Sequence, residues 1–142
     1  MTQQEECLTM HDVKHISTYI HRTPQEVYAF ASDPENLSAW AAGLASSEVK
    51  KNGDVWVAET PFGQAKIRFA ETNTFGVMDH DVELDSGVVV HNPMRVVPNG
   101  GGSEFIFTLL RQPGMSDDQF EDDAKAVTKD LRTLKELLEG ES

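Results

Sequence analysis

Alternation of apolar and polar residues predicts antiparallel strands along most of the chain. The first run with this pattern is Val13–Ile20, and further runs follow within residues 46–111. Short glycine-containing segments separate the runs, as is typical of β-hairpins. The four predicted turns are Lys51-Asn52-Gly53, Pro61-Phe62-Gly63, Asp85-Ser86-Gly87 and Asn99-Gly100-Gly101-Gly102. The pattern indicates a sheet with one apolar and one polar face.

The turn at residues 85–87 predicts which residues face each other across its hairpin, because loop length sets the register. A three-residue loop places His80 opposite Asn92 and Met78 opposite Met94. All four residues then lie on a largely apolar face. The opposite face carries mostly charged side chains and is predicted to be solvated.

The turn at residues 61–63 is also read as a three-residue loop. In this register Val57 faces Ile67 on the apolar side of the sheet. Trp56 then lies on the outer side beneath Arg68, as a cation–π pair.

Two helix starts follow the first strand back to back. Thr23 and Glu26 have the spacing of a capping box, and Pro24 suits the first helical turn. The dipeptide Asp33-Pro34 marks a second helix start in the same way, with a capping residue followed by proline. The helix after it places three residues on one face: Leu37, Trp40 and Ala41.

A long amphipathic helix is predicted at the C-terminus. Ser116 and Gln119 form another capping box, and an apolar stripe runs on for about six turns. The stripe consists of Phe120, Ala124, Val127, Leu131, Leu134 and Leu138. It is expected to pack on the domain's own sheet. A coiled-coil dimer is the alternative reading.

The chain of 142 residues has a net charge of -12, which opposes binding to nucleic acid or to an anionic membrane surface. No apolar run is long enough to span a bilayer. Cys7 is the only cysteine, so no intramolecular disulfide is possible, and a reducing cytoplasm fits. We expect a flexible tail over residues 1–10 and one domain over residues 11–142.

The run TP-x-E-V-x-x-F-x-x-D-P, which begins at Thr23, leads into Trp40 and is joined by the terminal helix. With these features the chain resembles the START/Bet v 1-like (SRPBCC) superfamily of polyketide cyclases/dehydrases and lipid-transport proteins, in an uncharacterised bacterial branch. The resemblance covers residues 13–138. It implies an α+β helix-grip fold, in which a curved antiparallel sheet of about six or seven strands wraps a long C-terminal helix. Two short helices after the first strand would close one end of a cavity.

His80 and Asn92 are the strongest candidates for chemistry, because burying either without a partner is costly. They bond each other or a trapped water as a structural pair, or they orient a ligand's carbonyl or hydroxyl group. His80 is also a weak candidate for a general acid or base. No catalytic or nucleotide-binding signature is present, and the histidines lack ligand spacing, so neither a metal nor another cofactor is expected.

Apolar residues of the predicted interior complete the candidate ligand site. With His80 and Asn92, they are Trp40, Phe69, Met78, Met94, Phe105, Phe107 and Phe120. Ordinary core packing is the alternative role for each of them.

The resemblance favours a protein, monomeric or homodimeric, that binds a small hydrophobic ligand of polyketide, lipid or aromatic type. A cyclase/aromatase or dehydratase-like enzyme with His80 as its acid–base group is the first alternative. A protein-interaction or stress-response adaptor with a filled core is the second. A cavity in the structure would favour the first two hypotheses.

Overall fold

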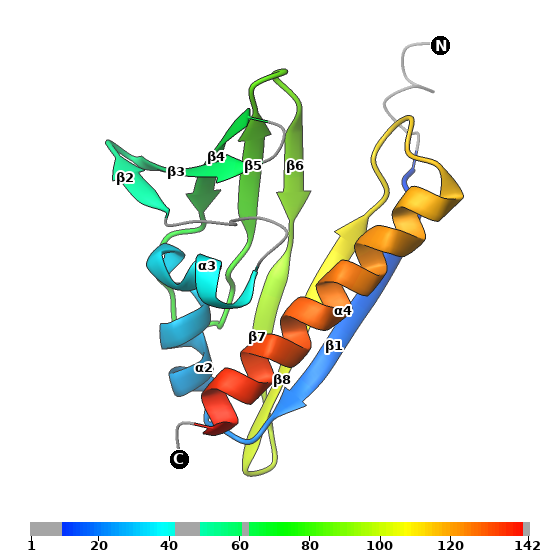
Figure 1. Ribbon diagram of the computed structural model, residues 1–142. Helices are drawn as coiled ribbons and strands as arrows, with labels where there is room; N and C mark the ends of the chain where they lie inside the picture. The colour runs from blue at the N-terminus through cyan, green and yellow to red at the C-terminus, as the bar shows by residue number, and fades with distance from the viewer. Residues whose placement is uncertain (1–9, 42–48, 61–62, 141–142) are drawn as a thin grey trace.

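The computed structural model describes residues 10–41, 49–60 and 63–140, and shows a curved antiparallel sheet crossed by one long helix (Figure 1). Along the chain the elements are β1 (Val13–Ile20), α2 (Pro24–Ala31), η1 (Pro34–Asn36), α3 (Leu37–Trp40), β2 (Lys50–Asn52), β3 (Val55–Thr60), β4 (Gly63–Phe69), β5 (His80–Leu84), β6 (Val89–Asn92), β7 (Met94–Asn99), β8 (Gly102–Leu110) and α4 (Asp117–Gly140). Residues 1–9 of the tail predicted over residues 1–10, Cys7 among them, lie outside the described residues.

The strands form two hydrogen-bonded ladders that join at Pro93. One ladder has the order β1-β8-β7 and the other β2-β3-β4-β5-β6. Proline lacks the N–H that a ladder needs, so the strand bends between β6 and β7. Backbone bonds bridge the bend: the Met78 N–H donates to the Met94 carbonyl at 2.8 Å, and the Thr108 N–H to the Pro93 carbonyl at 2.9 Å. The curved sheet and the long helix α4 confirm the helix-grip prediction, although the described residues form eight strands where about six or seven were expected.

The two predicted helix starts are present after β1. The Glu26 N–H donates to Thr23 Oγ1 at 3.2 Å, and the Thr23 N–H donates to Glu26 Oε1 at 3.1 Å, which completes the capping box. At the second start the Glu35 N–H donates to Asp33 Oδ1 at 3.0 Å. This start opens the 3₁₀ turn η1, which continues into the single turn of α3. Leu37 and Trp40 of that turn are buried.

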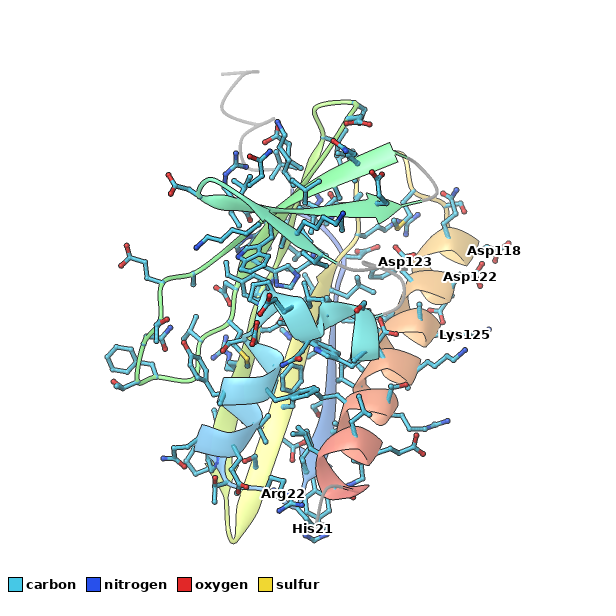
Figure 2. All side chains as sticks on the ribbon, turned by 60° about the vertical axis from the view of Figure 1, so that its left-hand side comes forward. His21, Arg22, Asp118, Asp122, Asp123 and Lys125 are labelled. Atoms are coloured by element: carbon cyan, nitrogen blue, oxygen red, sulfur yellow. The ribbon has the colours of Figure 1, made fainter. Side chains whose placement is uncertain are left out.

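The helix α4 begins at the predicted capping box, where the Gln119 N–H donates to Ser116 Oγ at 3.1 Å. Its apolar stripe packs on β1, β8 and α3, so the stripe serves this domain's own core as expected. Near the C-terminal end of α4, Arg22 Nε donates to the Leu138 carbonyl at 2.8 Å. Figure 2 shows His21 and Arg22 close to this end of the helix. This bond satisfies a carbonyl that the helix itself leaves unpaired.

The predicted register of the β5–β6 hairpin is confirmed. His80 pairs with Asn92 and Val82 with Val90, and the Gly87 N–H donates to the Leu84 carbonyl at 2.8 Å. The last hairpin also turns at its glycines as expected, with Asn99 paired to Gly102.

The predicted register of the β3–β4 hairpin is wrong by one residue. Thr60 pairs with Gly63 and Trp56 with Ile67, so the loop consists of residues 61–62, which are outside the described part. A one-residue slip moves side chains to the other face of the sheet. Trp56 accordingly packs against the core instead of lying under Arg68. Lys51 Nζ lies 5.9 Å from the Trp56 ring centroid, and Arg68 pairs with a glutamate.

A contact from the next hairpin accounts for this register. The Gln64 N–H donates to Asp85 Oδ2 at 3.0 Å, which holds the start of β4. Gly63 has φ +109, and a Cβ on it would lie 2.3 Å from the same oxygen. Glycine is therefore required as the first paired residue of β4. The first hairpin is likewise tighter than predicted, because Asn52 pairs with Val55 around a two-residue turn.

Candidate functional site

A cavity of about 260 Å³ lies between the sheet and α4, with α3 on one side. Figure 1 shows α3 beside α4, and the two helices pack against each other. The lining residues come from both helices and from β4 to β8: Leu37, Trp40, Ala41, Ala65, His80, Val82, Leu84, Val90, Asn92, Met94, Phe107, Leu109, Asp123, Ala126, Val127, Asp130 and Leu131. The wall is mostly apolar. Among the described lining residues, none is lysine or arginine.

His80 and Asn92 form what we call the floor of the cavity, on the neighbouring strands β5 and β6. His80 is 3% exposed, and its ring stacks on Phe69 with centroids 4.8 Å apart. Its Nδ1 lies 3.3 Å from the Met78 carbonyl, and its Nε2 lies 3.5 Å from Asn92 Nδ2. Because a carbonyl only accepts, these partners assign the ring proton to Nδ1 and leave Nε2 as the acceptor.

Burial lowers the pKa of His80 to about 4, because the charged ring loses its hydration. The Met78 carbonyl and the nearby Asp79 and Asp81 carboxylates oppose this shift. The ring is therefore neutral at pH near 7. In this state the floor offers hydrogen bonds without formal charge.

Trp40 contributes its indole ring to the wall of the cavity. Its side chain is 3% exposed and meets the Phe105 ring edge-on, with centroids 5.8 Å apart. The indole Nε1–H has no hydrogen-bond partner in the part of the chain that the structure describes. A buried donor without an acceptor costs about 1–3 kcal/mol.

Asp123 and Asp130 form what we call the rim, on the side of α4 that lines the cavity. They are seven residues apart, which is two helical turns or about 10.5 Å. Asp123 is exposed on one side, yet partial burial, followed by the charge of Asp122, raises its pKa. Ala126 lies between the two carboxylates, and its small side chain leaves space over the helix there.

The rim was missed in the sequence, although a signal was present. Asp123 directly precedes Ala124 of the apolar stripe, and Asp130 directly precedes Leu131. A residue next to the stripe lies about 100° away from it, so it can still border a cavity at the edge of the buried face.

The candidate site residues from the sequence fall into two groups. Those that line the cavity are Trp40, His80, Asn92, Met94 and Phe107. The others pack outside the lining: Phe69 behind His80, Phe105 against Trp40, Met78 in the central core, and Phe120 in a smaller cluster with Leu109 and Ala124. Ligand binding by any of them stays a prediction.

Within the described residues, no three His, Cys, Asp or Glu side chains are placed to hold a metal ion. No helix in the same part of the chain is long and apolar enough to cross a membrane. The cytoplasmic location and the monomeric or homodimeric state stay predictions.

Residues 11–139 match a protein-family model described as polyketide cyclase/dehydrase and lipid transport. No curated protein sequence matches the chain significantly.

Solved structures share the fold. The Aha1 dimer from Colwellia psychrerythraea is 13% identical, with a TM-score of 0.70 over 90% of this chain and 96% of that chain. An uncharacterised protein from Bacillus thuringiensis is 14% identical, with a TM-score of 0.70 over 89% and 98% of the two chains. Ara h 8.0201 is 10% identical, with a TM-score of 0.62 over 89% and 97%. At these identities the likeness shows the fold alone.

Proposed function

The chain belongs to the polyketide cyclase/dehydrase and lipid transport family, and from that premise we propose that it binds a small hydrophobic ligand between the sheet and α4. The observation that carries the proposal is the apolar cavity with a hydrogen-bonding floor. Its volume of about 260 Å³ lies just below the range of about 300–1,000 Å³ that is usual for small-molecule sites. A ligand of one or two rings, or a short acyl chain, is the best match in size.

The floor would orient such a ligand. The contact of 3.5 Å between Asn92 Nδ2 and His80 Nε2 is long for a hydrogen bond, so a ligand group can compete for either atom. A ligand hydroxyl could donate to Nε2, and a ligand carbonyl could accept from Nδ2. Apolar burial would supply most of the affinity, and these two atoms the orientation.

Acid–base catalysis by His80, as in a cyclase- or dehydratase-like enzyme, is the second candidate, because the ring lies in the lining. A pKa of about 4 makes the neutral ring a weak base near pH 7, so binding is the better-supported role. If His80→Gln left the turnover of a cognate substrate unchanged, the catalytic role would be excluded. The adaptor hypothesis predicts a filled core, so the cavity favours ligand binding over that hypothesis.

A substitution in the α4 wall of the cavity tests binding directly. Ala126 lines the cavity but is exposed, so Ala126→Phe should reduce the cavity volume at little cost in stability. We expect this variant to bind the neutral two-ring dye 1-aminonaphthalene at least about tenfold more weakly than the wild type, as measured by fluorescence titration.

Ala39→Phe is the matched control, because Ala39 is exposed on α3 and does not line the cavity. Wild-type dye affinity in both variants would contradict binding at this site.

A further inference from the structure

We propose that the floor of the cavity binds a cis-amide, as found in a lactam, whose N–H donates to His80 Nε2 and whose carbonyl accepts from Asn92 Nδ2. This inference rests on the proposed binding function and adds the polar group that the ligand carries. The remainder of the ligand would lie against the apolar wall. Ligands of the same shape that have a carbonyl alone, or a carboxylate, should bind more weakly.

The floor presents one acceptor and one donor, and the first argument is that their partners fix these roles. The Met78 carbonyl lies 3.3 Å from His80 Nδ1, which keeps the ring proton on Nδ1 and leaves Nε2 with a lone pair. Because Nε2 accepts, the Asn92 amide is assigned with its NH₂ group toward the ring. Neither atom has another hydrogen-bond partner among the described residues. A matching ligand therefore brings a donor for Nε2 and an acceptor for Nδ2.

The distance between the two atoms is the second argument, because it selects the shape of the ligand group. His80 Nε2 and Asn92 Nδ2 lie 3.5 Å apart. A single hydroxyl oxygen that bonded both atoms at about 2.8–2.9 Å would have an angle of about 75° between its two bonds, far below the tetrahedral angle. In a lactam the ring holds N–H and C=O on the same side, on atoms about 2.2 Å apart. Two nearly parallel hydrogen bonds can then reach the floor.

The neutral state of the floor is the third argument, and it disfavours a carboxylic acid, which also combines a donor with an acceptor. The pKa of His80 is about 4, so the ring is uncharged near pH 7. A ligand carboxyl group is ionised at that pH and only accepts, so its oxygen would face the Nε2 lone pair without a proton. Burying its charge would also be costly. A lactam is uncharged at the same pH and keeps both its donor and its acceptor.

The wall beside the floor suits the apolar part of such a ligand. Val82 and Val90 form the next pair on the same face of the β5–β6 hairpin, and both line the cavity. A ring fused to the lactam would pack against these two side chains. The cavity volume of about 260 Å³ fits a lactam of two rings.

The test compares two ligands of almost the same shape, 3,4-dihydro-2(1H)-quinolinone and 2-tetralone, in which a CH₂ group replaces the lactam N–H. Isothermal titration calorimetry near pH 7 should show that the lactam binds about threefold to tenfold more tightly than the ketone, because only the lactam can donate to Nε2. His80→Phe removes that acceptor, so it should abolish the preference for the lactam. A measurement on the wild type needs no variant: the ¹⁵N resonance of His80 Nε2 should shift more with the lactam than with the ketone.

His91→Phe is the matched control, because His91 is exposed on the outer face of β6 and pairs there with Asp81. It should keep the wild-type preference. Equal binding of lactam and ketone, or a preference that survives His80→Phe, would overturn the inference. Binding of the ketone without any preference for the lactam would leave the proposed function standing. If neither of these ligands nor the neutral dye bound, the proposed function would fail as well.

Discussion

The floor and the rim line the same cavity, but the floor has buried, neutral polar groups and the rim has charged groups near the solvent. At the floor, the His80 ring is 3% exposed, neutral and hydrogen-bonded to a backbone carbonyl and to Asn92. At the rim, the carboxylates of Asp123 and Asp130 lie on α4, where Asp123 still meets solvent. Desolvating a charge is far more costly than desolvating a hydrogen-bonded neutral group. Charge is therefore kept at the edge of the cavity.

This division assigns different tasks to the two regions. Hydrogen bonds at the floor depend on direction and distance, so they would select the orientation of a ligand. At the rim, Asp123 keeps part of its hydration, so its charge costs little free energy there. Changes at the floor should therefore alter stability more than changes at the rim.

Protonation of His80 at acidic pH should have the largest effect on the free energy of unfolding. The folded-state pKa of His80 is about 4, below the unfolded value of about 6.5, so the unfolded chain takes up the proton first as the pH falls. Stability from this residue is present above about pH 6.5 and is lost between there and about pH 4. The loss should amount to about 3 kcal/mol, measured as the free energy of unfolding in urea.

Two variants isolate this effect from the titration of carboxylates. His80→Gln should lose about 3 kcal/mol less than the wild type over the same pH range. His11→Gln should follow the wild type, because His11 is exposed. If the His80 ring titrated with a pKa near 6.5 by NMR, the neutral floor would be disproved.

Removal of Asn92 should have the next largest effect. Asn92→Leu leaves His80 Nε2 without its partner, and we expect a loss of about 1 kcal/mol in the free energy of unfolding. In a His80→Phe background the same change should cost much less, because no acceptor remains to be satisfied. A double-mutant cycle in urea measures the difference, and equal costs in both backgrounds would show that the two side chains do not interact.

Removal of a rim charge should have the smallest effect on stability. Asp123→Asn should stabilise the fold by at most about 0.5 kcal/mol near pH 7, because the raised pKa shows that its charged form is disfavoured there. Asp118→Asn should act in the opposite direction, since Asp118 lies in the first turn of α4, where the helix dipole favours a negative charge. Urea unfolding of the two variants side by side would reveal the opposite signs, and equal signs would contradict the partial burial of Asp123.

The floor could be predicted from the sequence because its geometry depends on local information. Gly87 has φ +90, which suits the three-residue turn, and the register of that turn sets His80 opposite Asn92. The β3–β4 register depends on a bond between Gln64 and Asp85, which are 21 residues apart, and no pattern within that hairpin contains it.

The rim and the exact lining could not be predicted for a different reason. Acidic residues on a helix are usually solvated, and their charge alone does not tell which of them border a cavity. Asp123 borders the cavity because Ala65 and Ala126 leave space between the sheet and α4. Conversely, Met78 and Phe105 are apolar and face inward as expected, but they pack within the core.

Native mass spectrometry of the protein purified from its own host tests most directly whether the cavity binds a ligand. The wild type should carry a small molecule that is released on denaturation, and Ala126→Phe should carry much less of it. Ala39→Phe, handled identically, should retain the wild-type amount. A bound molecule retained equally by Ala126→Phe, or no bound molecule in the wild type together with no dye binding, would contradict the account.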